Sequence, residues 1–353
     1  MTAAVDAISA PAGSRPSSAR GRALFALKLA VSAALIGYVL WGTDIVAIRA
    51  ALMDVAPMWL VLAFLLQVPG AALITWRWSL LLGAKGVRPG FGYLFGSTMA
   101  AGFFKQFLPS IIGGDAIRAY DSWRAGAGMG LSMVVLVIDR LLGLATLLGF
   151  ALVAAAFGAG AVEGVPDVGA WALALLALIG AMLAGLTWKG LPAGRLTAWR
   201  RRLPAAVQRK LSSIGEALRS FNGRSDVLLR GLAISVLTQV NIVVYYWLIA
   251  RSLGLDVPIE AFFLIMPIAV FVMMLPVTIN GIGLREAVLV ALLGYWSVSE
   301  PVAIAFAWLE FAGFLAFGLI GGVVYALPGR RMPVGARSPE RGIDSDGARR
   351  DSA

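Results

Sequence analysis

The chain has 353 residues, of which 59% are apolar and only 14% are charged, and its mean hydropathy is +0.84. Soluble domains carry about a quarter charged residues, so this composition is typical of a protein with several membrane spans of ~20 mostly apolar residues. The absence of Cys and His excludes disulfides, thiol nucleophiles, histidine bases and His/Cys metal sites. No metal and no cofactor is expected. The net charge of +11 lies mainly in tails and loops, which indicates membrane orientation rather than nucleic-acid binding.

The predicted elements begin with a disordered basic tail, residues 1–22, and a retained span from Ala23 to Trp41. Further apolar stretches are expected at 58–76, 91–112, 129–158, 170–188, 227–250, 261–280 and 287–327, the last with a break near Ser297–Pro301. The basic segment 189–226 and the tail 329–353 are expected in the cytoplasm, because loops rich in Lys and Arg stay there. The transmembrane domain therefore covers residues 23–328, with both termini inside.

Two apolar stretches do not fit a simple crossing. Loop 77–90 is basic, with Arg77, Lys85 and Arg88 and no acid, and the segment with Arg118 and Arg124 is basic too. Both are expected on the cytoplasmic side, so the stretch 91–112 between them should enter the membrane and return. The same count makes 261–286 a re-entrant element from the opposite face.

An internal repeat coincides with these two breaks. Residues 108–118 read LPSIIGGDAIR and residues 275–285 read LPVTINGIGLR, so that Pro109, Gly114 and Arg118 recur 167 residues later. Inverted repeats with Gly/Pro-broken segments at corresponding positions are typical of transporters whose substrate site lies where the breaks meet. We therefore predict an all-α polytopic membrane protein of two inverted repeats, about 23–160 and 170–328, each with a re-entrant element. The alternative is that both motifs are ordinary loop turns.

Two charges interrupt the predicted span 129–158. Asp139 and Arg140 stand among apolar residues, and a charge at a helix centre costs ~2.5–3.5 kcal/mol, so each should face a partner or a cavity. Asp139 is expected to meet Arg118 or Arg285, whereas Arg140 meets Glu286 or an anionic ligand. A buried ion-pair network that only fixes packing is the alternative.

Glycine-rich turns precede two predicted helices. A turn of this kind presents free N–H groups to an anion, and an arginine can hold a phosphate with two parallel hydrogen bonds. Of the other polar residues in apolar surroundings, Lys105 and Gln106 either contact the ligand or extend to the cytoplasmic surface. Glu310 is either the partner of a core arginine or part of a proton-coupled step.

Three motifs together resemble a known family. FKQFLPSIIGGDAIRAY, VLVIDRLLGL and LPVTINGIGLREAVLVALL follow one another in the chain, and in this they resemble the lysylphosphatidylglycerol synthase transmembrane region, also called the flippase-like or UPF0104 family. The resemblance covers about residues 23–328. It implies a multi-span protein of the bacterial inner membrane that moves a lipid between leaflets. The expected cargo is an anionic, aminoacylated or polyprenyl-phosphate-linked lipid. Bifunctional members carry a further soluble transferase domain after the spans, whereas this chain ends about 25 residues past its last predicted one. No aminoacylating activity is therefore expected, and the chain is predicted not to be an enzyme.

The resemblance also implies a set of functional positions. The expected lipid-headgroup cavity is lined by Gly113, Gly114, Asp115, Arg118, Asp139, Arg140, Asn280, Gly281, Gly283, Arg285 and Glu286; Pro109 and Pro276 break the helices, and Lys105, Gln106 and Glu310 serve coupling or packing. The arginines would receive the phosphate and the acids would offset them or contact a cationic headgroup. The expected partners are membrane lipids, with a homodimer or an envelope-biosynthesis protein as further candidates.

Two other functions remain open. One is a membrane-embedded lipid or glycan transferase, although the Asp-rich pairs that hold Mg²⁺ and a diphosphate are absent, and Asp115 and Asp121 are isolated. The other is a non-transporting subunit that recruits an enzyme of a cell-envelope glycolipid pathway through the basic segment. No ATP-binding motif is recognisable, so transport would use a gradient, a partner or downhill flow.

Overall fold

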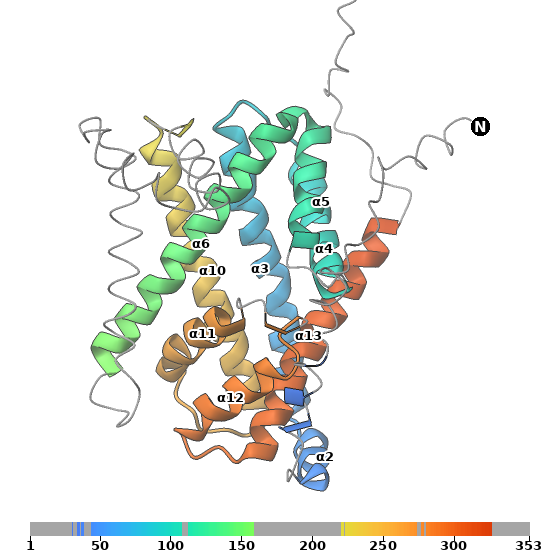
Figure 1. Cartoon of the computed structure of the whole chain (residues 1–353), viewed down its shortest axis with the longest axis vertical. Helices are drawn as coiled ribbons and strands as arrows, with labels where there is room; N and C mark the ends of the chain where they lie inside the picture. Colours follow the sequence, from blue (N-terminus) through green and yellow to red (C-terminus); the bar gives the residue numbers. More distant parts are fainter. Residues whose placement is uncertain are drawn as a thin grey trace, which may run out of the picture.

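The computed structural model is helical wherever it has regular structure among the residues it describes (Figure 1). These residues are 44–107, 112–158, 220–221, 223–273, 277–278 and 280–326, with a few positions between 30 and 38. The helices are α2 (Ile45–Met53), α3 (Pro57–Gly83), α4 (Phe91–Phe107), α5 (Ile112–Ser122), the π-helical turn η2 (Trp123–Ala127), α6 (Gly128–Gly158), α10 (Ser225–Ser252), α11 (Ile259–Met273), α12 (Leu284–Gly294) and α13 (Glu300–Ala326).

Four helical segments in the described part of the chain are long and apolar enough to cross a membrane. They are α3, a run from Gly114 to Leu152 that contains most of α6, then α10 and α13. The predicted polytopic all-helical class is thereby confirmed. The predicted spans 23–41 and 170–188, the basic segment 189–226 and the tails fall largely or wholly outside the described residues.

Each half has a long helix, then two shorter helices, then a second long helix. In the first half α3, α4, α5 and α6 have 27, 17, 11 and 31 residues; in the second half α10, α11, α12 and α13 have 28, 15, 11 and 27. At ~1.5 Å per residue the short helices fall below the ~30 Å of a bilayer core. In Figure 1, α4 and α5 lie in the upper half of the view and α11 and α12 in the lower half. Inversion of the halves and re-entrant insertion, which refer to a bilayer, stay predictions.

The halves are joined by two helix pairs with small residues at their contacts. α3 packs along α10, and α13 packs along α4. A Cβ atom at Gly70 of α3 would lie 2.6 Å from Asn241 Oδ1 of α10, and one at Gly321 of α13 would overlap the backbone carbonyl of Met99. Small residues allow membrane helices to approach this closely, which is how apolar helices gain packing energy in lipid.

Candidate functional site

A buried ion-pair cluster lies in the first half. Asp139 of α6 accepts a hydrogen bond of 2.6 Å from Arg77 Nε of α3 and one of 3.0 Å from Arg118 Nη1 of α5. Arg77 also donates to Ser235 Oγ of α10 at 2.7 Å, and the Arg118 guanidinium lies over the ring of Trp78. All three charged side chains are less than a tenth exposed. Of the two partners expected for Asp139, the structure provides Arg118.

Arg77 is the member of this cluster that the sequence placed wrongly. It was assigned to a cytoplasmic loop because Lys85 and Arg88 follow it, yet it lies within α3 and is 7% exposed. The apolar run WSLLLG after Arg77 is the signal for this. It shows that the helix continues for almost two turns beyond the charge.

A second buried cluster lies in the other half. Arg285 Nε of α12 is 3.1 Å from Glu310 Oε2 of α13, and the Tyr246 hydroxyl of α10 donates to Glu310 Oε1. Glu310 is 2% exposed, and the Arg285 guanidinium lies over the ring of Phe311. Glu310 was expected to be either the partner of a core arginine or part of a proton-coupled step. The structure gives it a core arginine as its partner. Tyr246 was not expected at the site, because nothing distinguishes it from other tyrosines near a span end.

The two clusters have the same plan. In each, an arginine of the second short helix (Arg118 or Arg285) pairs with an acid of the following long helix (Asp139 or Glu310). The third partner comes from the first long helix of the same half, an arginine of α3 in one case and a tyrosine of α10 in the other. Each pair links a short helix to the next long helix. Each charge also offsets the other, because burying either one without a partner would cost free energy.

Glycines of the repeated motif pack at corresponding places. A Cβ at Gly114 would lie 2.7 Å from the carbonyl oxygen of Ala101 and 3.5 Å from Lys105 Cβ, so α4 and α5 meet there without room for a side chain. At Gly281, which has φ +75°, a Cβ would lie 3.5 Å from Cγ of Met273. Both contacts lie near the ends of α4 and α11. At the 167-residue offset of the repeat, the counterpart of Lys105 is Val272 and that of Met273 is Gln106.

The two interruptions meet in space. Asn280 Nδ2, just before α12, donates to the backbone oxygen of Gln106 near the end of α4, at 2.6 Å. Asn280 adopts a positive φ of 51°, a conformation that Asn tolerates better than most residues. Residues 174 apart in the chain are thus in direct contact. The contact joins the two segments that the repeated motif predicted to meet.

The start of α12 is closed by its own side chain. Glu286 Oε2 accepts from the backbone N–H of Gly283 at 2.8 Å, in a capping-box arrangement. Glu286 is buried. The free N–H group expected there for an anion is thus already bonded, and Glu286 pairs with α12 itself rather than with Arg140.

Three accessible charged residues lie beside these breaks. Arg140 of α6 holds Asp115 of α5 with three contacts of 2.8–3.1 Å, and the side chains are 53% and 26% exposed. Lys105 is exposed and lies within electrostatic range of both members of this pair and of Arg285 and Glu310. We call Lys105, Asp115 and Arg140 the accessible charge group. Among the described residues no carboxylate forms a salt bridge with Lys105.

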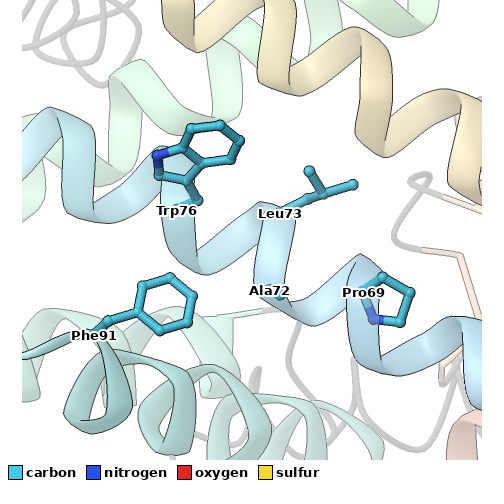
Figure 2. Close-up of a pocket in the computed structure, with 5 residues that line it drawn as sticks. All are labelled: Pro69, Ala72, Leu73, Trp76 and Phe91. Carbon is cyan, nitrogen blue, oxygen red and sulfur yellow. The ribbon is translucent and has the colours of Figure 1, made fainter.

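Two of the cavities in the described part of the chain are apolar and lie on the sides of the long helices. The larger, of about 430 Å³, is lined by α3 and the start of α4; Figure 2 shows its lining residues Pro69, Ala72, Leu73, Trp76 and Phe91. The smaller, of about 210 Å³, lies between α3, α10 and α13. Neither is lined by a residue of the predicted headgroup cavity.

The remaining predicted residues are Gly113 and the two prolines of the predicted helix breaks. Gly113 lies in α5, whereas Pro109 and Pro276 lie outside the described residues. No group of three or more acids that could hold a metal occurs in the described ranges. Headgroup contact by any of these residues stays a prediction.

The fold defines a multi-pass α-helical membrane protein with a buried cluster of charged residues in each half. The model of the family described as the lysylphosphatidylglycerol synthase TM region matches residues 25–326, and the chain belongs to this family. It is also similar to a UPF0104 membrane protein of Methanothermobacter thermautotrophicus, 25% identical over 311 residues, which cover 80% of this chain and 88% of the relative. The family predicted from the three motifs is confirmed, and the chain is a membrane protein of lipid metabolism.

The expectation that the chain is not an enzyme is wrong as stated. The matching family bears the name of a synthase, which is an enzyme-type description. The expectation rested on the further soluble transferase domain of the bifunctional members and on the absence of Asp-rich pairs from this sequence. An absence of familiar catalytic motifs does not exclude chemistry that uses other residues.

Proposed function

We propose that this protein translocates a membrane lipid between leaflets, with the headgroup passing the accessible charge group. The observation that carries the proposal is the contact between Asn280 and Gln106, which joins two broken helical segments beside exposed charges. Non-helical backbone at membrane depth is tolerated where it is buried in protein or lines a wet cavity. The protein would act in a cell membrane, the bacterial inner membrane by resemblance, with its termini in the cytoplasm.

The burial of the charges divides the arginines into two roles. Arg118 and Arg285 face carboxylates and are less than a tenth exposed, so we assign them to positioning of α5 and α12. Arg140 is half-exposed and can exchange Asp115 for a phosphate, to which its fork of donors is equally suited. An exposed charge such as Lys105 or Arg140 inside the membrane needs water or an anionic ligand, and a passing headgroup supplies the latter.

The proposal is tested by leaflet exchange of fluorescent lipids in proteoliposomes. We expect wild type to exchange lipid and Arg140→Gln to slow the exchange about tenfold, the effect of ~1.4 kcal/mol of lost headgroup binding. Arg251→Gln is the matched control, because Arg251 forms an exposed pair with Asp256 at the end of α10. Equal exchange by both variants, or no exchange by folded wild type, would refute the proposal.

A second candidate is a lipid-modifying transferase, which the name of the family favours. In that case the accessible charge group binds a phospholipid as an acceptor rather than as cargo. Mass spectrometry of the liposome lipids after incubation with aminoacyl and glycosyl donors distinguishes the two. A new lipid species that requires Arg140 would establish the transferase.

A further inference from the structure

The equivalence of the two halves separates residues that hold the fold from residues that are free for recognition. Lys105 packs against Gly114 and is a cation, whereas its counterpart 167 residues later, Val272, is apolar. A feature that occurs in both halves serves their common architecture. A feature present in one half alone needs another explanation.

The other two accessible charges are also confined to the first half. Arg140 follows Asp139 directly, and at the corresponding place in the second half Phe311 follows Glu310. Asp115 follows Gly114, whereas Ile282 follows Gly281. All three members of the accessible charge group thus correspond to apolar residues in the second half. The buried Arg–acid pair, by contrast, is common to both halves.

The accessible charge group carries one net positive charge, from two cations and one carboxylate. Asp115 is engaged by Arg140 on both of its oxygens, so the charge of Lys105 is the one left over. Arg285 and Glu310, the nearest charges from the other half, are buried and compensate each other. At this place in the fold a ligand with one negative charge restores neutrality, while a cationic ligand adds repulsion in a medium of low dielectric constant.

We propose that the preferred cargo is a lipid with a single negative charge, a phosphodiester headgroup without added cationic groups. Its phosphate binds Lys105 and Arg140, and its chains stay in the bilayer. This inference rests on the proposed function. It selects against lipids whose headgroups carry extra amines and a net positive charge, and it singles out Lys105 as the residue that sets this preference.

The test compares lipids of different headgroup charge in proteoliposomes. Fluorescent phosphatidylglycerol, phosphatidylethanolamine and lysyl-phosphatidylglycerol carry one net negative charge, none, and one net positive charge. We expect wild type to exchange phosphatidylglycerol about tenfold faster than the lysyl form, which corresponds to ~1.4 kcal/mol. Lys105→Met, which replaces the cation with an apolar side chain of similar length, should remove this preference, and Lys105→Glu should reverse it.

The control variant is Arg88→Gln, which removes an exposed positive charge from the loop before α4 and should leave the preference unchanged. Equal exchange of phosphatidylglycerol and the lysyl lipid by wild type would overturn the inference. An unchanged preference in Lys105→Glu would do so as well. Uptake of inorganic phosphate into the vesicles that depends on Lys105 would show that the ligand is the free anion rather than a lipid.

Binding separates this inference from the proposed function. Short-chain dihexanoyl phosphatidylglycerol and its lysyl derivative are titrated into the purified full chain in detergent. Charge-selective binding that depends on Lys105, without leaflet exchange, would refute translocation and retain the substrate class. Exchange of lipids without charge preference would retain translocation and refute the substrate class.

Discussion

Asp139→Asn is expected to be among the most destabilising conservative substitutions in the protein. The side chain of Asp139 is 4% exposed and lies between guanidinium groups 2.6 and 3.0 Å away. Asparagine has the same size but no charge, so Arg77 and Arg118 would stay buried without compensation. Removing one partner of a buried ion pair costs about 3–5 kcal/mol, and within a membrane no bulk water is available to repay it.

Asp115→Asn provides the matched comparison. Asp115 also pairs with an arginine of the same region, but Arg140 is 53% exposed, and exposed pairs contribute only about 0–1 kcal/mol. Unfolding in mixed micelles by added sodium dodecyl sulfate, followed by tryptophan fluorescence and circular dichroism, measures both variants. Equal losses of stability in Asp139→Asn and Asp115→Asn would refute the argument from burial.

A rescue experiment tests the physical cause. Adding Arg118→Gln to Asp139→Asn removes one of the two uncompensated charges, so the double variant should recover part of the lost stability. If the cost instead arose from lost packing, the second substitution would add to the damage. A double variant less stable than Asp139→Asn alone would therefore overturn the electrostatic explanation.

Three further expectations concern other parts of the fold. Gly321→Ala should cost about 1–3 kcal/mol through overpacking, because its Cβ would overlap the backbone of α4, whereas Gly102→Ala should be tolerated because no atom lies within 4 Å of its Cβ; micelle unfolding compares the two. Tyr246→Phe removes a donor to the buried carboxylate of α13 and should cost about 1.5–3 kcal/mol, and an unchanged unfolding midpoint would contradict this. Burial lowers the pKa of Lys85, in the loop after α3, below its ordinary 10.5; its amine should therefore lose its proton at a lower pH, which pH-dependent acetylation with peptide mass spectrometry would detect as a labelling midpoint below that value.

The repeated motif could be recognised from the sequence because its Pro and Gly residues restrict the backbone locally. Pro, Gly and a following apolar run mark the end of one helix and the start of the next wherever the chain goes. The recurrence of Gly114 and Arg118 as Gly281 and Arg285 therefore pointed to equivalent places, and the structure gives both arginines equivalent partners. Hydropathy likewise gave α3, α6, α10 and α13 to within a few residues, apart from the seven-residue extension of α3 that holds Arg77.

The partners of the buried charges were only partly predictable. Arg118 was one of two arginines considered for Asp139, because a buried acid needs a cation but composition does not say which. Arg77 was not predicted because a basic residue near the end of a span is also typical of a cytoplasmic loop. Tyr246 was not predicted because its hydroxyl is uncharged, and only charged residues stand out in an apolar segment.

By itself the sequence determined that the chain is a multi-pass helical membrane protein, which family it resembles, and that one motif recurs in its two halves. These properties follow from hydropathy and from residues that restrict their own backbone. Only the tertiary structure decided which charges are buried and which are accessible, because that depends on side chains that approach across 21 to 174 residues of chain. It buried Arg118 and Arg285 beside carboxylates and brought Lys105, Asp115 and Arg140 into one accessible group.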